Sequence, residues 1–422
     1  MTPTTPLPEL RDYQLARVRR LLADALPGNA FYARKFAGLP LDDFYSLPFT
    51  TKAELAADQT DHPPYGSTLS YPRERYCRLH QTSGTSTGRP LRWLDTPESW
   101  EWLLNCWQVS FPFMGLTARD KIFFPFSFGP FLGFWTAFEA ATRAGFLCIP
   151  GGGMTSTARL RFLVEHECTV VFATPTYALH LAELAAKEGI DLASSSVRAL
   201  VVAGEPGGNI PATRERIEAV WGARVFDHYG MTEVGPVAVE AENERGMMYL
   251  LESEYIAEVL TPDTNTPAPP GEFGELVLTN LGRTGSPLIR YRTGDLVRLA
   301  TNPDPAGRTW RRLDGGILGR ADDMIHVRGN NLYPSAVEAI IRRFPAVAEY
   351  RIHVDYSGPL ADLRIEVEPT PGANADEVAE VVSRAVRDEL LFRVEVTAAA
   401  PGSLPRFEMK ARRIQRNVKG KM

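Results

Sequence analysis

The sequence lacks several features that would place the protein in a specialised class. It has four cysteines among 422 residues and no C-x-x-C pair, so neither a disulfide framework nor a zinc cluster is expected. The formal net charge of -5 excludes a general attraction to nucleic acid or to anionic membranes. Internal repeats and low-complexity segments are also absent. The cysteines, expected to be reduced thiols, are Cys77, Cys106, Cys148 and Cys168.

Long hydrophobic runs are missing as well. No uninterrupted apolar segment reaches the roughly 18 residues that a membrane-spanning helix needs. Residues 1–6 have neither the basic nor the apolar region of a secretion signal. We therefore expect a cytoplasmic protein with no membrane partner. The hydrophobic content of 44% and the charged content of 23% are those of an ordinary globular chain, expected at this length to form two or three domains.

Short apolar segments alternate with helical patterns through the middle of the chain. Thr96 is suited to cap a helix that starts with Pro97 and Glu98. The expected strands are Ile122–Pro125, Phe146–Ile149, Val170–Ala173, Ala199–Ala203 and Arg224–Phe226. The expected helices are Leu10–Leu26, Ala158–Glu167, Tyr177–Glu188 and Pro211–Trp221. Alternation at this spacing predicts crossover units on a mostly parallel sheet.

The pattern changes after this region. Period-two segments at Tyr249–Val259 and Gly274–Thr279, joined by Pro- and Gly-rich turns, predict an antiparallel β subdomain over about residues 246–300. The elements expected after it are Met324–Arg328, Ser335–Arg343, Tyr350–Asp355, Leu363–Glu368, Ala375–Leu391 and Arg393–Thr397. The fold class is therefore α/β: a large N-terminal domain of residues 1–319 with mostly parallel sheets plus the antiparallel subdomain, and a small α+β C-terminal domain of residues 320–422 on a hinge.

A loop rich in hydroxyls and glycines is expected at Thr82–Pro90. Backbone N–H groups of such a loop can surround phosphate oxygens, and Arg89 adds a fixed positive charge. The loop lacks the Gly-Lys-Ser/Thr ending of a Walker loop. Because a cluster of Ser, Thr and Gly is more often a plain turn, it does not establish a nucleotide site alone. The candidate ligands are Thr82, Ser83, Gly84, Thr85, Ser86, Thr87 and Gly88.

The most specific motif is the run that ends at Glu233, directly after an expected strand. Tyr229 offers a flat face for an adenine ring. Thr232 offers a hydroxyl for phosphate, and Glu233 offers a carboxylate for Mg²⁺, which takes one or two carboxylates beside substrate phosphates. The other residues of the run, also candidate nucleotide contacts, are Asp227, His228, Gly230 and Met231.

Asp295 closes a second polar run, Tyr291–Asp295. A carboxylate can accept hydrogen bonds from both ribose hydroxyls, as acidic residues do in dinucleotide-binding folds. An isolated Arg-x-Gly-Asp sequence would more often be a salt-bridged turn. The position of Asp295, after Glu233 and before Gly319–Arg320, favours ribose binding.

These motifs, together with Gly319–Met324 and the basic segment Pro405–Arg413, resemble those of the adenylate-forming superfamily and, within it, of the phenylacetate-CoA ligase family. The motifs run in family order from His80 to Arg413. The Thr82–Pro90 loop is one residue longer than usual, and Met409 replaces a glycine of the C-terminal lysine motif. The resemblance implies an enzyme, an AMP-forming ligase that activates a carboxylic acid with ATP and Mg²⁺ and transfers the acyl group to coenzyme A.

The resemblance also implies roles for further residues. Arg320 would contact the nucleotide near the domain junction, and Asp322 would be the hinge. Lys410 would bridge the substrate carboxylate and the α-phosphate, because a cation stabilises two anions brought together in a transition state. With Thr232 and Glu233, it forms the expected catalytic set. The turn expected to border the adenine consists of Gly204, Glu205 and Pro206.

The stretch Phe126–Trp135 corresponds to the substrate-binding segment of the family. Its aromatic density suits an aryl ring, with Gly129 and Gly133 leaving room, so an aromatic carboxylic acid in a largely apolar pocket is expected. The same aromatic side chains could instead belong to the core. The candidate substrate contacts are Phe128, Phe131, Gly133 and Trp135.

Two other functions remain open. The adenylate could pass to a carrier-protein thiol or to an amine in place of coenzyme A. The chain could also be a non-catalytic nucleotide-binding regulator on the same fold, although the retention of Glu233, Asp295 and Lys410 speaks against this. The sequence identifies neither the acid nor the acceptor, and it leaves the oligomeric state open, a homodimer included.

Overall fold

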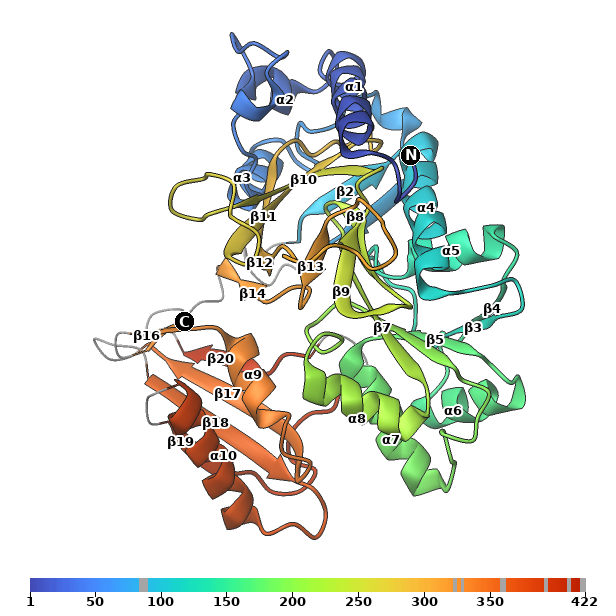
Figure 1. The fold of residues 1–422 in the computed structure, drawn as a ribbon, viewed down its shortest axis with the longest axis vertical. Coiled ribbons are helices and arrows are strands. Elements are labelled where there is room, and N and C mark those ends of the chain that lie inside the picture. Colours follow the sequence, from blue (N-terminus) through green and yellow to red (C-terminus); the bar gives the residue numbers. More distant parts are fainter. Residues whose placement is uncertain are drawn as a thin grey trace.

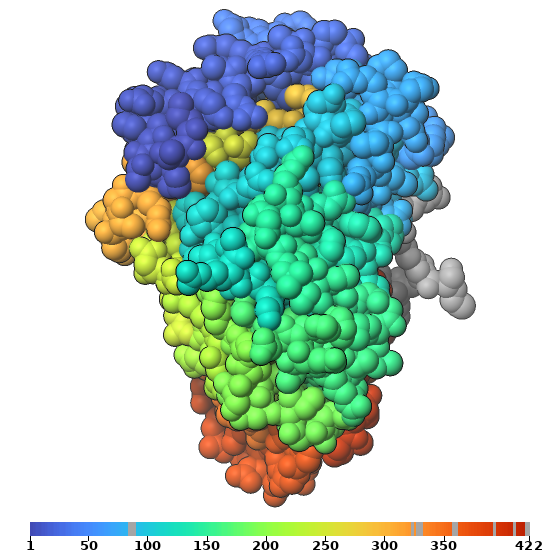
Figure 2. All heavy atoms as spheres, turned by 90° about the vertical axis from the view of Figure 1, so that its right-hand side faces the viewer, coloured from blue at the N-terminus to red at the C-terminus, as the bar shows by residue number. Residues whose placement is uncertain are grey.

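The molecule is elongated, with the N-terminal helices at one end and the C-terminal strands and helices at the other (Figure 1, Figure 2). The computed structural model describes residues 1–82, 90–321, 325–327, 330–356, 362–390, 394–407 and 411–417. Among the described helices, none combines the length and the apolar character needed to cross a membrane.

An eight-stranded sheet forms the centre of the molecule, in the order β13-β9-β8-β7-β6-β5-β3-β4. Its parallel half consists of β3 (Lys121–Phe124), β4 (Leu147–Pro150), β5 (Val170–Ala173), β6 (Ala199–Val202) and β7 (Arg224–Met231). Its antiparallel half adds β8 (Gly235–Ala241), β9 (Glu244–Leu250) and β13 (Arg312–Asp314). The change of pairing occurs at β7, which has a parallel neighbour on one side and an antiparallel neighbour on the other.

Helices cover both faces of the parallel half. Phe123 and Phe124 are neighbours on β3 but belong to different core clusters, because successive side chains of a strand point to opposite faces. Phe123 shares its cluster with α6 (Ser156–Glu165), α7 (Pro175–Glu188) and α8 (Pro211–Trp221). Phe124 shares the other with α4 (Pro97–Ser110) and α5 (Trp135–Arg143). The predicted cap of α4 is confirmed, since Thr96 Oγ1 accepts from Ser99 N at 3.2 Å.

A four-stranded antiparallel sheet follows, in the order β10-β11-β12-β14. Its strands are β10 (Tyr255–Leu260), β11 (Phe273–Asn280), β12 (Tyr291–Arg298) and β14 (Gly319–Arg320). The expected single strand Tyr249–Val259 is wrong, because the chain turns after Leu250 and passes from one sheet to the other before Tyr255. The antiparallel subdomain predicted for this region is otherwise present.

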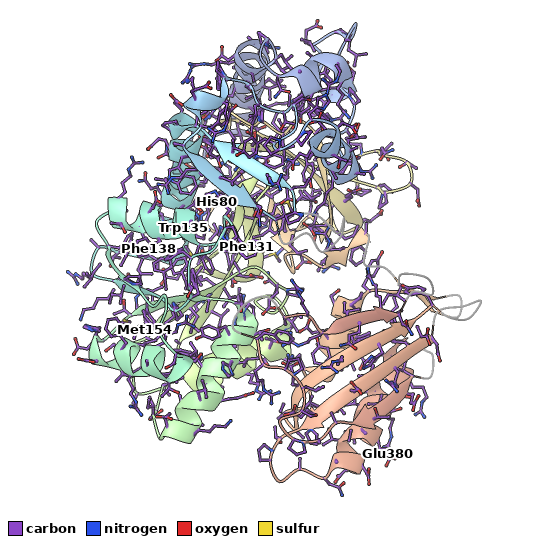
Figure 3. The ribbon with its side chains drawn as sticks, turned by 180° about the vertical axis from the view of Figure 1, so that it is seen from behind. His80, Phe131, Trp135, Phe138, Met154 and Glu380 are labelled. Atoms are coloured by element: carbon purple, nitrogen blue, oxygen red, sulfur yellow. The ribbon has the colours of Figure 1, made fainter. Side chains whose placement is uncertain are left out.

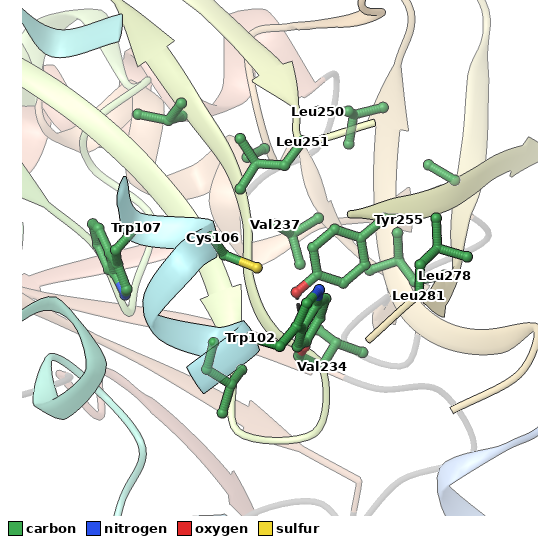
Figure 4. Packing of buried hydrophobic residues seen from close by; sticks show 14 of the residues in the cluster. Trp102, Cys106, Trp107, Val234, Val237, Leu250, Leu251, Tyr255, Leu278 and Leu281 are labelled. Atoms are coloured by element: carbon green, nitrogen blue, oxygen red, sulfur yellow. Dashed lines mark hydrogen bonds between the residues drawn. The ribbon is translucent and has the colours of Figure 1, made fainter. Parts of the chain in front are cut away.

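The α4 helix packs into the angle between the two sheets (Figure 4). Trp102 of α4 and Tyr255 of β10 meet edge to face, with ring centroids 5.3 Å apart. The Tyr255 hydroxyl donates to the Val234 carbonyl at 2.8 Å and so fixes the turn between β7 and β8. Gly235 follows that turn with φ +93, and a Cβ there would lie 2.3 Å from Leu103 Cδ2, so this close approach requires glycine.

The N-terminal region lies against the antiparallel sheet at the top of Figure 1. It contains the helices α1 (Leu7–Ala25), α2 (Ala30–Lys35) and α3 (Lys52–Asp61), and a two-stranded sheet of β1 (Arg78–Gln81) and β2 (Arg92–Asp95). Short 3-10 helices lie at Phe44–Ser46, Arg73–Arg75 and Phe111–Met114. The helix predicted at Leu10–Leu26 is confirmed as α1, three residues longer at its start.

The C-terminal region is a separate α+β domain with its own core, formed by residues such as Val337, Ile352, Ile365 and Val382. Its elements are β15 (Ile325–Val327), β16 (Asn330–Leu332), α9 (Pro334–Ile341), β17 (Val347–Asp355), β18 (Asp362–Pro369), α10 (Ala375–Leu390), β19 (Glu395–Ala398) and β20 (Ile414–Asn417). The larger sheet has the order β19-β18-β17-β20. The sequence predicts all of these elements except β16 and β20.

Candidate active site

The run Asp227–Glu233 lies where the large sheet changes from parallel to antiparallel pairing. The run was expected to follow its strand, but β7 continues to Met231 because β8 supplies hydrogen-bond partners for the additional residues. The pairing is irregular between Tyr229 and Gly230, a feature that often re-aims a side chain at a functional site. The last residues of the run form the turn to β8. The run thus lies at the carboxyl edge of the parallel strands, where open α/β sheets bind ligands.

Tyr229, Asp295 and Arg320 come together from three strands. The Tyr229 hydroxyl donates to Asp295 Oδ2 at 2.6 Å, and Arg320 donates to Asp295 Oδ1 at 3.1 Å. Burial, followed by the charge of Asp295, raises the pKa of Tyr229 well above its usual value, which keeps the hydroxyl a donor. A carboxylate has about four acceptor positions, which is the chemistry that binding of two ribose hydroxyls requires.

A buried arginine that the sequence analysis missed holds the backbone of the turn. Arg283 donates to the carbonyl oxygens of Thr232 and Glu233, at 2.8 and 2.9 Å. The same guanidinium binds both carboxylate oxygens of Asp95 at 2.6 Å, and both side chains are 0% exposed. Because Asp95 ends β2, the turn that presents Glu233 is fixed to a strand far away in the sequence.

Lys52 is a second residue that the sequence analysis missed. Its Nζ lies 3.4 Å from Glu233 Oε1. The segment before α3 is fixed along β12, since Thr50 N donates to the Arg290 carbonyl and Arg292 N donates to the Thr50 carbonyl, both at 2.9 Å. A capping-box pattern at the start of α3 could have predicted the helix, but no local signal places Lys52 beside Glu233.

Asp227 and His228 are held within the protein. Asp227 Oδ2 accepts from Asn209 at 2.6 Å, and burial, followed by the charge of Glu240, raises the pKa of Asp227 to about 7. The His228 ring stacks on Trp107 with centroids 4.0 Å apart. Burial lowers the pKa of His228 to about 3, so its imidazole is neutral at neutral pH. These contacts favour a packing role for His228.

The turn Gly204–Pro206 follows β6, as the sequence predicts, and it lies beside both α7 and the C-terminal domain. Gly204 has φ +93, a conformation that favours glycine. Glu205 Oε1 accepts from Thr176 N at 2.8 Å, and Glu205 Oε2 accepts from Ala411 N at 2.6 Å.

The aromatic stretch forms a ring cluster beside the central sheet. Phe128 and Trp135 have centroids 4.5 Å apart and pack against the main core, and Trp135 Nε1 donates to the Gly129 carbonyl at 2.9 Å. Phe131 is half-buried and lies beside Gly129, whose added Cβ would be 3.7 Å from the ring.

The loop that carries Phe131 is attached to β1, because Gln81 N donates to the Pro130 carbonyl at 2.7 Å. In Figure 3 the labels of Phe131, Trp135 and Phe138 lie together, next to that of His80. Gly133, exposed with φ +38, lies in the same loop.

Several predicted site residues lie outside the described residues, including Lys410, the hinge Asp322 and the loop residues Ser83, Gly84, Thr85, Ser86, Thr87 and Gly88. Thr82 is described at the base of that loop. Its backbone N–H donates to the Leu91 carbonyl at 2.9 Å, and its hydroxyl accepts from Leu91 N at 3.0 Å. Thr82 thereby closes the base of the loop.

The carboxylates of the site fit a cation that is bound mainly by substrate. Within the part of the chain that the structure describes, no group of three or more His, Cys, Asp or Glu is arranged to hold a metal ion. Glu233 would supply one carboxylate. That donor set suits Mg²⁺, which commonly takes one or two carboxylates together with phosphate oxygens and water.

Comparisons with known proteins agree with this geometry. Residues 56–282 match the AMP-binding enzyme family, and residues 329–417 match the AMP-binding enzyme C-terminal domain. The chain belongs to the AMP-binding enzyme family. Phenylacetate-coenzyme A ligase of Thermus thermophilus is 32% identical to it over 434 residues, which cover 96% of each chain. This AMP-binding enzyme thus groups with the phenylacetate-CoA ligases.

Solved structures of a 2-hydroxyisobutyryl-CoA ligase, 30% identical, cover 98% of this AMP-binding enzyme and 91% of their own chain. The structure in the postadenylation state, in complex with 2-HIB-AMP, superimposes with a TM-score of 0.92. The structure in complex with 2-HIB-AMP and CoA in the thioesterification state gives 0.73. The computed structure therefore has the domain arrangement of the former.

Proposed function

We propose that this chain is an ATP-dependent carboxylate-CoA ligase, which activates an aromatic carboxylic acid as acyl-AMP and transfers the acyl group to coenzyme A. The observation that carries the proposal is the meeting of Tyr229, Asp295 and Arg320 at the carboxyl edge of the sheet, close in sequence to the turn that presents Glu233. Tyr229 would supply a ring face for the adenine, and Asp295 would accept hydrogen bonds from the ribose. Glu233 would supply a carboxylate beside the phosphates. The family relationship supports the same activity.

In the first half-reaction, a carboxylate oxygen of the acid attacks the α-phosphorus of ATP, and the bond to the β-phosphate breaks to release pyrophosphate. Tyr229 would stack against the adenine, and Asp295 would accept from the ribose hydroxyls. Lys52, beside Glu233, would stabilise the negative charge of the departing pyrophosphate. Lys410 would bridge the two anions as they meet. Magnesium, when bound, neutralises phosphate charge, and Glu233 would hold it.

In the second half-reaction, the thiol sulfur of coenzyme A attacks the acyl carbon, and AMP leaves with the oxygen that the acid contributed. The α+β domain would turn between the half-reactions, because Lys410 must be near the phosphate only in the first. The sequence analysis puts the boundary between the domains at residues 319 and 320. Because Arg320 belongs to β14, which pairs with β12 of the large domain, we place the boundary after Arg320 and the hinge at Asp322.

The acid would lie against the aromatic loop. Phe131 is better placed than Phe128 to contact a ring, because Phe128 is packed between Trp135 and the core. Aryl rings gain about 0.5–1.5 kcal/mol from such aromatic neighbours beyond their area burial. This favours an aromatic acid over a short aliphatic one.

A panel of carboxylic acids, assayed by pyrophosphate release with and without coenzyme A, tests the function. The proposal predicts acid-dependent release for aromatic acids, with sustained turnover only when coenzyme A is present. Release that is indifferent to coenzyme A would indicate a carrier-protein thiol or an amine as acceptor. Nucleotide binding without release for any acid would indicate a non-catalytic regulator.

A further inference from the structure

The turn Gly204–Pro206 carries a carboxylate that links segments far apart in the sequence. One Glu205 oxygen accepts from Thr176 N in the first turn of α7, and the other accepts from Ala411 N of the C-terminal domain, at 2.8 and 2.6 Å. Because Glu205 precedes a proline, its backbone is restricted to extended conformations, which limits the positions of its side chain. Glu205 therefore joins the expected adenine side of the site to the mobile domain.

A second contact crosses the same boundary. Arg413 donates to Thr176 Oγ1 at 3.1 Å. Within its own domain, Arg413 binds both oxygens of Glu349 on β17 at 2.6 and 3.0 Å, and it is 8% exposed. Since Arg413 is fixed to β17, its bond to Thr176 ties the position of the domain to the start of α7. The contacts of Glu205 and Arg413 thus both join the C-terminal domain to the large domain beside Thr176.

The atom that Glu205 holds belongs to the peptide bond between Lys410 and Ala411. The contact therefore fixes the chain directly beside the lysine expected to act in adenylation. The domain arrangement is the one that a relative adopts in its postadenylation state, with a TM-score of 0.92, as against 0.73 for the thioesterification state. The contact between Glu205 and Ala411 is thus associated with the domain arrangement of adenylation, not with that of thioester formation.

We infer that Glu205 is a positioning residue, which holds the segment that begins at Ala411, directly after Lys410, in place for adenylation and releases it when the domain turns for thioester formation. This inference rests on the proposed function. It assigns Glu205 a role in the balance between the half-reactions that is separate from contact with the adenine.

The variant Glu205→Gln tests the inference, because the amide places an NH₂ group against one of the two N–H donors. Acyl-adenylate formation should fall about ten-fold, with little change in KM for ATP. Conversion of supplied acyl-AMP and coenzyme A to acyl-CoA should be unchanged or faster. Equal losses in both half-reactions, or a raised KM for ATP with unchanged kcat, would overturn the inference, because they describe an ordinary nucleotide contact.

Two further variants complete the design. Thr176→Val removes the hydroxyl that accepts from Arg413 but keeps the shape of the side chain and the backbone N–H that donates to Glu205. Like Glu205→Gln, it should slow adenylation. Glu188→Gln, at the far end of α7 and paired with Arg161 at 2.7 Å, should leave both half-reactions unchanged. A Thr176→Val enzyme with normal adenylation would contradict the role assigned to this surface.

Hydrogen exchange gives a readout that does not depend on activity. Exchange of the Ala411 amide, followed in a peptide that begins several residues before Lys410, should be faster in Glu205→Gln than in the unaltered protein and in Glu188→Gln, because the Ala411 amide loses its charged acceptor. Unchanged exchange would overturn the inference even if the enzyme made no acyl-CoA. Failure of the inference and failure of the proposed function are thereby distinguishable.

Discussion

Glu233 lies at the tip of a fixed turn, with its carboxylate 3.4 Å from the Lys52 ammonium group. Glu233 is 5% exposed. A side chain held in this way can contribute a full charge to a hard cation without first being ordered. Replacement of Glu233 should therefore change mainly the magnesium requirement of the reaction.

The variant Glu233→Gln should depress adenylation and raise the magnesium concentration needed for half-maximal rate, because a neutral amide binds a hard cation poorly. The effect should be at least as large as the roughly 10–100-fold loss typical of residues that support metal ligands indirectly. Magnesium titration of pyrophosphate release measures it. Glu244→Gln, which alters another enclosed, arginine-paired carboxylate away from the site, should leave the magnesium requirement unchanged. An unaltered requirement in folded Glu233→Gln would exclude the ligand assignment.

Phe131 and Phe128 differ in their surroundings, so their replacement should have different effects on acid specificity and on the stability of the protein. Phe131→Ala should change the ranking of aryl acids while the KM for ATP stays roughly constant. Phe128→Ala should also lower the melting temperature, because Phe128 packs against Trp135 and Phe138. Its cost should stay below the roughly 3–5 kcal/mol of a fully buried phenylalanine. If Phe131→Ala lowered activity equally with every acid and also lowered the melting temperature, Phe131 would be a core residue.

The turn between β7 and β8 depends on elements that are distant in the sequence. The Arg283 guanidinium binds Asp95 and two carbonyls of the turn with no exposed surface. Lysine at this position keeps the charge but cannot make the same set of hydrogen bonds. Replacement should therefore disturb the backbone that presents Glu233 as well as the stability of the protein.

Arg283→Lys should raise the magnesium concentration for half-maximal adenylation by about 10–100-fold, together with a lower melting temperature. Arg312→Lys is the matched control, since Arg312 is also buried and binds both Glu244 and the Asn302 carbonyl, away from the site. It should lower the melting temperature alone. The same magnesium shift in both variants would show that the effect arises from general destabilisation.

The elements of the site were largely predictable from the sequence, whereas the contacts between them were not. Apolar runs such as Val170–Ala173 predict buried parallel strands, and all four residues of this one are buried. The extension of β7 to Met231 was missed because its polar residues are paired by β8, a strand that the sequence analysis did not predict. Lys52 and Arg283 contact Glu233 or its turn from distant segments, so only the folded chain reveals them.

For the molecule as a whole, one site must serve two reactions. Asp322→Pro should trap one domain arrangement, because proline restricts its own φ and the conformation of the residue before it. Adenylate formation should be retained, and thioester formation from supplied adenylate should be lost. Lys410→Ala should do the reverse. If both folded variants failed equally in both half-reactions, domain alternation would be the wrong description.

The central claim, that the acid is activated as an acyl adenylate and passed to a thiol, is tested most directly by oxygen transfer. An aromatic acid labelled with ¹⁸O in both carboxylate oxygens is converted with ATP and coenzyme A, and the products are analysed by mass spectrometry. Attack of the carboxylate on the α-phosphorus predicts one ¹⁸O in AMP, one in the thioester and none in pyrophosphate. Unlabelled AMP, or formation of ADP with labelled phosphate, would contradict the account.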